Sequence, residues 1–406
     1  MAVYSAKDED ARPESGEQTR GSLQGAPEAS PVLRGVLARR DFLFGMTSLA
    51  APFARPSASE NTGAATLRSA GASKNLLIGT CVSYRELQQP QFTDLLAKQS
   101  SIVVCENEMK WGRIHPEPDR FDFTRGDALM NFAESHGQKL RGHNLCWHEQ
   151  LPGWFDSVAT KENAAALLRR HIETVAGHYA GHVHSWDVVN EAISVKDNLP
   201  AGMRDTPWYR LIGPAYLDIA FQAARLADPH AILTYNDFDL EHDTPEYEAK
   251  RQAVLKLLQG LKTRNMPVQA LGLQSHLSAG TQPYNWDPLH RFIKQVDELG
   301  LEIFVTELDV DDSRLPADIA QRDRGVAQLY RDYLDNVLQH RSVKAVLTWG
   351  LTDRDTWLTR TKPRKDGLPQ RPLPFDPDLE PAPAFFSMIT AIGKAPGPAP
   401  AARQQS

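Results

Sequence analysis

The stretch HSWDVVNE, residues 184–191, reads as a buried strand that ends on two polar residues. Trp186, Val188 and Val189 are apolar, and valine favours strands. Strands that are buried on both faces, as in parallel sheets, read as continuous apolar runs. Asn190 and Glu191 contribute nothing to such packing. The stretch therefore predicts a parallel strand that carries an amide and a carboxylate to its carboxyl end.

Seven further apolar runs of this kind occur in the chain, and segments with helical periodicity separate them. The predicted strands are residues 76–82, 102–105, 140–146, 184–189, 232–236, 270–274, 302–306 and 343–348. The predicted helices are residues 91–99, 126–137, 161–179, 215–227, 245–264, 289–299, 317–340 and 384–393. Eight strand–helix units predict an α/β fold, a single (β/α)8 TIM barrel. A doubly wound open sheet is the alternative, but it normally binds its ligand at one switch point, and the sequence has no GxGxxG loop.

The residues outside the barrel indicate an exported protein. Residues 1–38 are polar and rich in Ala, Glu, Ser, Gly and Pro, which predicts a disordered leader. Residues 39–59 hold two adjacent arginines before a short apolar segment, which resembles a twin-arginine export signal. Residues 60–73 are predicted as a linker, 74–394 as the barrel and 395–406 as a flexible tail. We therefore expect export by the twin-arginine route to the periplasm or the outside of the cell. The alternative is a disordered tail with a chance hydrophobic patch.

Composition argues against several classes of partner. The chain has 406 residues, 41% hydrophobic and 24% charged, with a formal net charge of -6, which is an ordinary globular composition. No Lys/Arg cluster is interleaved with aromatic residues, so we expect no nucleic-acid partner. No apolar run reaches the roughly 18 residues of a membrane-spanning helix, so we expect no membrane association of the mature form. Cys81, Cys105 and Cys146 lie in apolar stretches, which predicts buried free thiols. We expect a monomer.

Polar residues and tryptophans follow seven of the eight predicted strands. The carboxyl ends of barrel strands surround one opening, and a purely structural barrel has no reason to gather polar groups there. Glu191 follows the fourth strand, and Glu307 ends the seventh in IFVTELDV. Hydrolysis of an acetal needs two such carboxylates, one to protonate the departing oxygen and one to act on the cationic sugar centre. For each glutamate taken alone, a surface acid is the alternative.

The neighbouring residues suit a sugar. Carbohydrate hydroxyls need donors and acceptors, and the apolar faces of sugar rings need flat partners. The candidates are Asn107, Lys110, His143, Gln150, Asn190 and Gln274 for hydrogen bonds and Trp111, Trp147, Trp154, Trp349 and Trp357 for stacking. Core packing is the alternative for Trp111, Trp154 and Trp357, and a solvated position is the alternative for Lys110. No histidine or cysteine spacing matches a metal site, and we expect no metal and no cofactor.

Five motifs give these residues a family resemblance. They are GHNLCWHEQLPGW (142–154), WDVVNEA (186–192), LGLQSHL (271–277), VTELDV (305–310) and LTWGLTDRDTW (347–357). In this order they resemble glycoside hydrolase family 10, the endo-1,4-β-xylanases, over residues 74–394. The resemblance implies that xylan and xylo-oligosaccharides are the substrates.

The resemblance also implies a retaining mechanism in two displacement steps. It implies Glu191 as the acid/base and Glu307 as the nucleophile. It further implies Asn190 as the partner of the 2-hydroxyl, His276 as the residue that orients the nucleophile and Asp309 as its support. The residues it implies for the sugars on the non-reducing side are Glu106, Asn107, Lys110, His143 and Gln150, and the aromatic walls are Trp147, Trp349 and Trp357.

The chain departs from the family pattern in a few places. Phe238 and Asp239 stand where the family usually has Tyr and Asn, and Glu149 stands where it usually has Ser. The segment RTKPRKDGLPQRPLPF, residues 360–375, is more basic than expected, and a basic rim would favour xylan that carries acidic sugars. Two alternatives stay open: a catalytically inactive barrel that binds polysaccharide or protein, and a related β-glycanase that prefers glucan.

Overall fold

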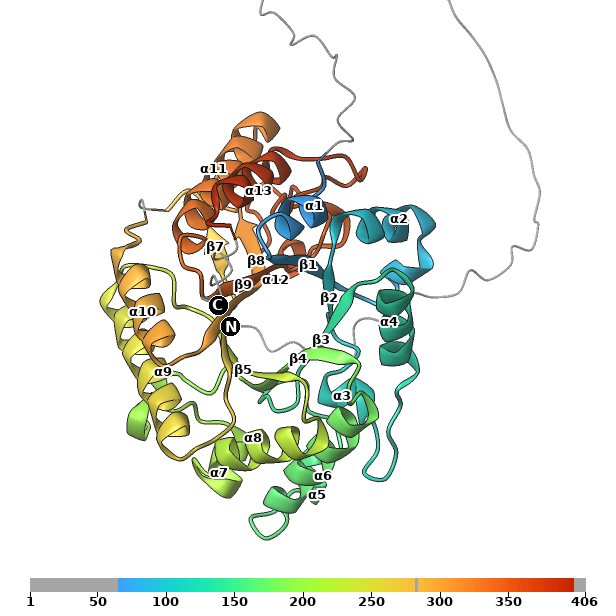
Figure 1. The fold of residues 1–406 in the computed structure, drawn as a ribbon, viewed down its shortest axis with the longest axis vertical. Coiled ribbons are helices and arrows are strands. Elements are labelled where there is room, and N and C mark those ends of the chain that lie inside the picture. Colours follow the sequence, from blue (N-terminus) through green and yellow to red (C-terminus); the bar gives the residue numbers. More distant parts are fainter. Residues whose placement is uncertain (1–64, 282–283, 398–406) are drawn as a thin grey trace, which may run out of the picture. The chain divides into compact units, whose positions relative to one another are not determined.

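The computed structural model describes residues 65–281 and 284–397 (Figure 1), which belong to one compact unit. The predicted leader (1–38) and signal segment (39–59) lie outside the described residues. So do residues 60–64 of the predicted linker and 398–406 of the predicted tail. The structure thus covers the predicted barrel, 74–394, apart from residues 282–283.

Eight parallel strands close into a ring, which confirms the predicted (β/α)8 barrel. Each strand pairs with the next around the ring, and the last pairs with the first. The strands are β1 (Leu77–Val82), β2 (Ile102–Cys105), β3 (Lys139–His143), β4 (Val183–Asn190), β5 (Ile232–Asp237), β6 (Ala270–Leu273), β8 (Glu302–Asp311) and β9 (Val343–Thr348). A short ninth strand, β7 (His276–Ser278), lies outside the ring and pairs with the second half of β8.

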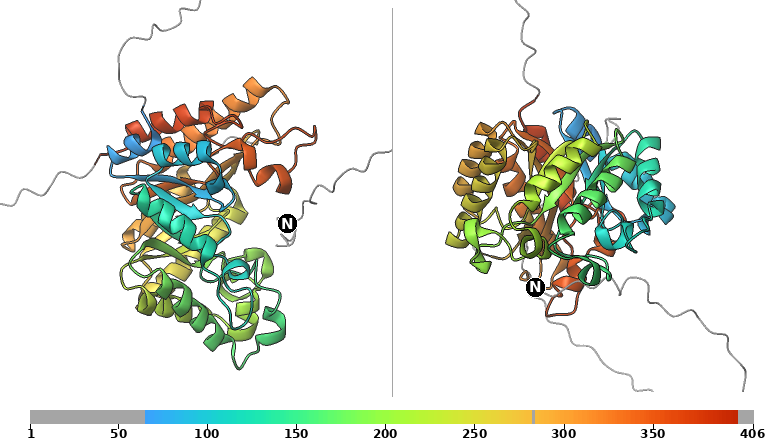
Figure 2. Two further views of the ribbon diagram at one scale, coloured as in Figure 1. Left: turned by 90° about the vertical axis from the view of Figure 1, so that its right-hand side faces the viewer. Right: turned by 90° about the horizontal axis from the view of Figure 1, so that it is seen from below.

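Helices surround the ring, as Figures 1 and 2 show from three directions. The main ones are α2 (Pro90–Gln99), α4 (Thr124–Ser135), α6 (Ala164–His178), α8 (Tyr216–Ala227), α9 (Pro245–Thr263), α10 (Asp287–Glu298), α11 (Ile319–Val337) and α13 (Pro383–Lys394). Shorter helices are α1 (Leu67–Ala72), α3 (Trp111–Ile114), α5 (Phe155–Val158), α7 (Pro207–Ile212) and α12 (Leu358–Thr361). Each main helix corresponds to a predicted helix. The prediction succeeds because a helix that packs on a sheet carries an apolar stripe, which is visible in its sequence.

Helix α1 lies inside the range 60–73 that the sequence pattern predicts as a linker. The hydroxyl of Thr66 accepts from the backbone N–H of Ser69, and the Ser69 hydroxyl accepts from the N–H of Thr66, each at 3.0 Å. This is a reciprocal cap of the first turn. Leu67 is buried, and its N–H donates to the Gln99 side chain at 2.9 Å. The barrel unit therefore begins before Lys74.

Strand β8 is longer than predicted and runs through Glu307 to Asp311. Glu307 therefore lies within a strand rather than at its end, which corrects the sequence-based placement. Beyond Thr306 the residues alternate in polarity, and the intervening Leu308 and Val310 are fully buried. Successive side chains of a strand point to opposite faces. Glu307 and Asp309 thus share one face of β8.

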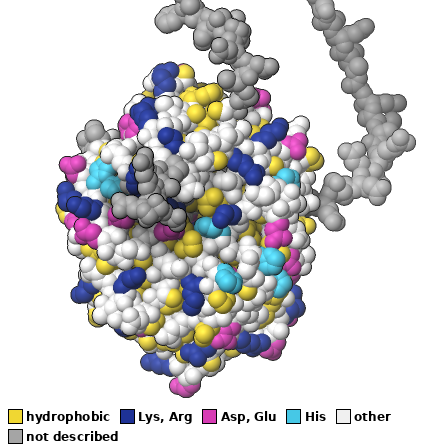
Figure 3. All heavy atoms as spheres, in the orientation of Figure 1, with side chains coloured by type: hydrophobic (Ala, Val, Ile, Leu, Met, Phe, Trp, Pro, Cys, Tyr) yellow, Lys and Arg dark blue, Asp and Glu magenta, His cyan; other side chains and the backbone are white. Residues whose placement is uncertain are grey.

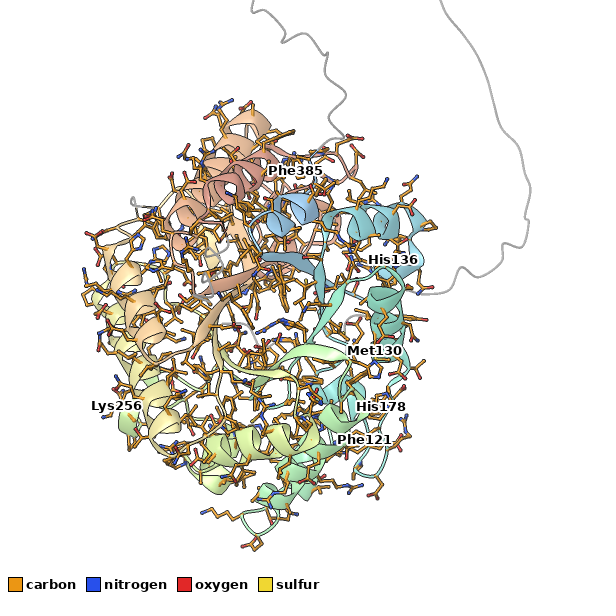
Figure 4. The ribbon with its side chains drawn as sticks, in the orientation of Figure 1. Phe121, Met130, His136, His178, Lys256 and Phe385 are labelled. Atoms are coloured by element: carbon orange, nitrogen blue, oxygen red, sulfur yellow. The ribbon has the colours of Figure 1, made fainter. Side chains whose placement is uncertain are left out.

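Two of the candidate sugar-stacking tryptophans, Trp111 and Trp154, pack against each other. Trp111 is 1% exposed, stacks on His171 at a ring-centroid distance of 3.5 Å and donates its indole N–H to the carbonyl of Leu145. Trp154 packs against Trp111 and donates to the carbonyl of His115. Phe121, a further ring of this cluster, lies away from the central strands in Figure 4. The stacking prediction is wrong for Trp111, which is buried, whereas for the partly buried Trp154 it stays a prediction.

Cys81, Cys105 and Cys146 are buried and free, as predicted. Among residues 65–281 and 284–397, no helix is both long and apolar enough to span a bilayer. The expected monomeric state and the expected lack of a nucleic-acid partner stay predictions.

Candidate active site

The predicted site residues lie where the strands end at the carboxyl face of the barrel. His143 and Asn190 are the last residues of β3 and β4, and Glu191 and Gln274 directly follow β4 and β6. The others come from β7, from the second half of β8 and from the loops after β2, β3 and β9; they are Glu106, Asn107, Lys110, Trp147, Gln150, His276, Glu307, Asp309, Trp349 and Trp357. Hydrogen bonds connect many of these side chains into one site.

Glu307 is a buried carboxylate with a side-chain partner at each oxygen. Asn236 Nδ2 donates to Oε1 at 2.8 Å, and His276 Nε2 lies 3.3 Å from Oε2. Burial alone would raise the pKa of Glu307. The hydrogen bond from His276, electrostatic attraction to His143 and His276, and the hydrogen bond from Asn236 outweigh that effect and hold the pKa below its ordinary value. Glu307 is therefore ionised at neutral pH.

His276 is held between two acids. Its Nδ1 lies 2.9 Å from Oδ1 of the fully buried Asp309. Burial alone would lower the pKa of His276, but the charge of Asp309, the hydrogen bond to Asp309 and the contact with Glu307 raise it to about 10. The imidazole is therefore cationic at neutral pH and donates from both nitrogens. Trp357 Nε1 donates to the other oxygen of Asp309 at 2.7 Å, which ties this aromatic wall to the same acid.

Glu191 lies half-buried beside this group, and neighbouring amides hold its carboxylate. Gln274 Nε2 and Asn190 Nδ2 donate to Glu191 Oε1 at 3.0 and 3.2 Å. The backbone N–H of Glu307 donates to the carbonyl of Gln274 at 3.0 Å, so one residue contacts both glutamates.

Two asparagines join the glutamates into a continuous hydrogen-bonded chain. Asn236 Nδ2 donates to Asn190 Oδ1 at 2.9 Å as well as to Glu307. The hydroxyl of Thr306 donates to Asn236 Oδ1 at 2.7 Å, which fixes the orientation of this amide. Uncharged groups thus link the two carboxylates.

A second set of residues lies on the side of β2, β3 and β9. Lys110 is 5% exposed, donates to Asn107 Oδ1 at 3.0 Å, and places its Nζ 5.1 and 5.7 Å from the ring centroids of Trp147 and Trp349. Gln150 Nε2 donates to the same Asn107 oxygen at 3.4 Å. Lys110 is therefore a buried residue of the site and not a solvated surface lysine.

Beside these residues the structure is hollowed. A small pocket is lined by Glu106, Trp349 and Trp357, among others. Two indoles and a carboxylate in one lining suit a ring that has apolar faces and hydroxyl edges.

Asp187, on the neighbouring strand β4, orients His143. Its Nδ1 lies 2.9 Å from Asp187 Oδ2, and Arg141 donates to the other oxygen of the same fully buried carboxylate. His143 also packs edge-on against Trp349 at 5.4 Å between ring centroids. Its placement next to an aromatic wall is thus fixed by a buried ion pair.

Glu149 and Phe238, two of the departures from the family pattern, lie near Glu191, the first through its charge and the second through Arg204. Burial, followed by the negative charge of Glu191, raises the pKa of Glu149, while Arg204 and Lys110 oppose the shift. Lys250 Nζ lies 3.7 Å from the ring centroid of Phe238, and Tyr247 donates its hydroxyl to Asp239 at 2.9 Å.

Part of the basic charge of segment 360–375 is held in ion pairs. Arg364 is 5% exposed and lies in ion pairs with Asp312 and Asp366, and Arg371 lies in one with Asp323. On the face shown in Figure 3, basic and acidic side chains are interspersed. Arg360, Lys362 and Lys365 are exposed, so the segment keeps positive charge at the surface and the preference for acidic sugars stays a prediction.

Three residues that build the site were not singled out from the sequence. Asp187 orients His143, Asn236 connects Glu307 with Asn190, and Arg204 donates to the backbone carbonyl of Glu191 at 2.7 Å. Asn236 ends a predicted strand in YND, so its position was a usable signal. Asp187 lies inside a strand and Arg204 in an irregular segment, where neither spacing nor composition marks them.

Within the described ranges, no group of three or more His, Cys, Asp or Glu side chains is arranged to hold a metal ion. The side chains of the site are instead carboxylates, amides, imidazoles and indoles. This set is suited to proton transfer and to the binding of hydroxyl groups.

A closed barrel with two linked glutamates and aromatic walls at its carboxyl face has the form of a glycoside hydrolase. The chain belongs to glycosyl hydrolase family 10, whose family model matches residues 66–391. The match begins at the cap of α1, which agrees with the earlier start of the barrel unit.

Individual relatives are similar over most of their length. The chain is 36% identical over 322 residues to a Beta-1,4-xylanase of Dictyoglomus thermophilum, covering 77% of this chain and 87% of that one. Native xylanase 10B from Thermotoga maritima is 33% identical with a TM-score of 0.74, covering 81% and 98% of the two chains. Xylanase 10B from Thermotoga petrophila RKU-1, solved in complex with xylobiose, is 33% identical with a TM-score of 0.75, covering 82% and 99%.

Proposed function

We propose that this protein hydrolyses internal β-1,4-xylosidic bonds of xylan with retention of configuration, Glu307 acting as the nucleophile and Glu191 as the acid/base. The observation that carries the proposal is the contrast between the two carboxylates. Glu307 is kept ionised by a cationic histidine, whereas Glu191 is contacted by neutral amides. Two carboxyl groups in different environments are what this chemistry requires.

The reaction then proceeds in two displacements. In the first, Glu307 attacks the anomeric carbon while Glu191 gives its proton to the departing oxygen, and a covalent glycosyl-enzyme forms. In the second, Glu191 takes a proton from a water molecule, which attacks the anomeric carbon and releases Glu307. We assign Asn190, which contacts Glu191 directly and Glu307 through Asn236, to the 2-hydroxyl of the reacting sugar.

The substrate assignment rests on the family and on the shape of the site. Trp349 and Trp357 are both fixed by the site, the first against His143 and the second on Asp309. Rigid indoles around the reacting ring favour a pentose, because a hydroxymethyl group would need extra room. We assign Glu106, Asn107, Lys110, His143 and Gln150 to the sugars on the non-reducing side and Trp147 to the wall above them.

Product analysis tests this function directly. Unbranched xylan, glucuronoxylan and a mixed-linkage β-glucan are incubated side by side with the protein. We expect a rapid fall in xylan viscosity, xylo-oligosaccharide products that are first released as β-anomers in proton NMR, and little release from the glucan. Faster glucan cleavage would select the β-glycanase alternative, and tight binding of xylan without any product would select the inactive barrel.

The acid limb of the pH profile should depend on His276. The imidazole lowers the pKa of Glu307, so its replacement in His276→Gln should move the acid limb of kcat/KM by about one pH unit or more toward higher pH. The control is His136→Gln, which alters an exposed histidine that Figure 4 shows at the edge of the molecule. An unmoved acid limb in His276→Gln would contradict the assigned contact.

The raised pKa of His276 also makes the stability of the protein depend on pH. The pKa of His276 is raised from its ordinary value of 6.5 to about 10, so the stabilisation that it contributes is complete below pH 6.5. That contribution is lost as the pH rises toward 10. The wild-type protein should therefore lose more stability over this range than His276→Gln does, as urea unfolding at each pH would measure.

We further propose that residues 39–59 direct export by the twin-arginine route to the periplasm or the outside of the cell. The support is the sequence alone, with Arg39 and Arg40 before a short apolar segment. Replacing both arginines with lysine should retain the full-length chain inside a host that has this pathway, whereas Arg20→Lys should not. Equal amounts of exported protein from both variants would overturn the proposal.

A further inference from the structure

Glu191 adopts a backbone conformation that its residue type rarely adopts. Its φ is 57°, in the left-handed region, where a side chain with a Cβ is disfavoured. Its N–H donates to the carbonyl of Asn236 at 2.9 Å, and its carbonyl accepts from Arg204 Nε at 2.7 Å. These two bonds hold the peptides on both sides of the Cα. They therefore set the direction in which the carboxylate leaves the backbone.

Arg204 is itself firmly seated. Its Nη2 donates to the carbonyl of Ile193 at 3.3 Å, and its backbone N–H donates to the carbonyl of Ala192 at 2.7 Å. Its guanidinium carbon lies 5.4 Å from the ring centroid of Phe238, within the range of a cation–π contact. The side chain thus spans from the strand end at Glu191 to the loop after β5.

Phe238 is fixed by a second cation. Lys250 Nζ lies 3.7 Å from the ring centroid and forms an ion pair of 2.8 Å with the fully buried Asp237. The backbone N–H of Phe238 donates to the same carboxylate at 2.9 Å. The ring that contacts Arg204 is therefore anchored from the barrel core, and its role here needs no phenolic hydroxyl.

We propose that Arg204, seated on Phe238, is a positioning residue that holds Glu191 in the orientation needed for proton transfer; this rests on the proposed acid/base role of Glu191. A general acid must place its proton within hydrogen-bond reach of the leaving oxygen. Without the bond from Arg204, the left-handed turn at Glu191 relaxes and the carboxyl group leaves that position. Proton donation suffers, while attack by Glu307 does not.

A purely structural role of Arg204 makes a different prediction. Arg204 closes the segment between Glu191 and itself, in which Ile193 and Met203 form an antiparallel bridge. If Arg204 only maintained this segment, its loss would reduce activity on all substrates alike. The dependence on the leaving group separates the two roles, because only a poor leaving group needs the proton.

The test compares Arg204→Met and Arg204→Lys with a matched control, Arg210→Met. Arg210 lies on the same stretch of chain, in an exposed ion pair with Asp205. The substrates are two aryl xylobiosides, one with dinitrophenolate and one with phenolate as leaving group. We expect Arg204→Met to lose about 10²-fold in kcat/KM with the phenyl substrate and less than about 3-fold with the dinitrophenyl substrate. Arg204→Lys, which keeps one donor, should lie between Arg204→Met and the wild type, and Arg210→Met should match the wild type.

A double variant sharpens the result. Added to Glu191→Ala, Arg204→Met should cause less than about a 2-fold further loss, because residues that act through each other are not additive. Equal losses of Arg204→Met on both substrates, or full additivity with Glu191→Ala, would overturn the proposal. If Glu191→Ala itself showed no dependence on the leaving group, the acid/base assignment of Glu191 would be wrong. Failure of that assignment can thus be distinguished from failure of the positioning role of Arg204.

Phe238→Leu provides a second route if Arg204→Met does not fold. This variant keeps both side-chain hydrogen bonds of Arg204 and removes only the ring that its guanidinium contacts. It should show the same dependence on the leaving group with a smaller loss, about 3- to 10-fold with the phenyl substrate. A Phe238→Leu variant that loses equally on both substrates would also overturn the proposal.

Discussion

Glu307→Gln is expected to lose hydrolysis of xylan by about 10⁴- to 10⁶-fold, the range in which loss of a covalent nucleophile falls. The amide cannot form the glycosyl-enzyme, and it is nearly the same size as the carboxylate. Binding of xylo-oligosaccharides should change little, because Lys110, Asn107 and the tryptophans are untouched. Initial rates on xylan, together with calorimetric titration of xylotetraose, measure both effects.

Chemical rescue by azide tests specifically whether Glu307 is the nucleophile. In Glu307→Ala, azide can enter the vacated space and attack a β-linked aryl xylobioside directly, so the product should be the α-glycosyl azide. The matched control is Glu302→Gln, which alters a half-buried glutamate at the other end of the same strand and should keep its activity. Normal turnover by Glu307→Gln, or an azide product of β-configuration from Glu307→Ala, would refute the nucleophile assignment.

Glu191→Ala is expected to lose about 10²- to 10⁴-fold in kcat/KM on substrates with poor leaving groups. Its loss on a dinitrophenyl xylobioside should be small, because dinitrophenolate departs without a proton. With that substrate the second displacement becomes limiting, so kcat and KM should fall together. Steady-state kinetics over a series of aryl xylobiosides gives these values.

Azide also distinguishes the role of Glu191 from that of Glu307. It should accelerate Glu191→Ala with the dinitrophenyl substrate and give the β-glycosyl azide, because it attacks a glycosyl-enzyme that is already inverted. Glu246→Ala, at an exposed glutamate paired with Lys196, serves as the control. Equal losses of Glu191→Ala across all leaving groups would remove Glu191 from the acid/base role.

The barrel was predictable because its strands are continuous apolar runs. The predicted strands 102–105 and 343–348 agree with β2 and β9 at both ends. The end of β8 was not predictable in this way, because Glu307, Asp309 and Asp311 read as a polar loop. In the structure they alternate with buried apolar residues, and β7 pairs beside them. Tertiary pairing, rather than local composition, thus sets the length of this strand.

The site was predictable to the extent that its residues follow strands. Glu191 satisfies that rule, and the sequence motifs implied the contact of His276 with Asp309 that the structure contains at 2.9 Å. Trp111 and Trp147 look alike in sequence, yet the ring of Trp147 lies 5.1 Å from the Lys110 Nζ, whereas the ring of Trp111 packs on His171. Burial of a tryptophan depends on which helices pack around it, which no local pattern specifies.

Long-range partners were the least predictable part. Arg204 lies 13 residues beyond Glu191 and contacts its backbone rather than its side chain, so residue type gives no indication of it. In the same way, Arg364 reads as a surface charge but is buried against Asp312, 52 residues away. Both cases require knowledge of how distant segments meet.

The amides around Glu191 also decide which of its two oxygens can be protonated. Asn190 and Gln274 both donate to Oε1, and an oxygen that accepts two N–H bonds has its lone pairs engaged. Asn190 cannot turn its amide around, because its carbonyl oxygen already accepts from Asn236. Oε2 is therefore the oxygen on which the proposed acid/base role requires the proton. In the proposed mechanism, two uncharged side chains thereby select the edge of the Glu191 carboxyl group from which the glycosidic oxygen is protonated.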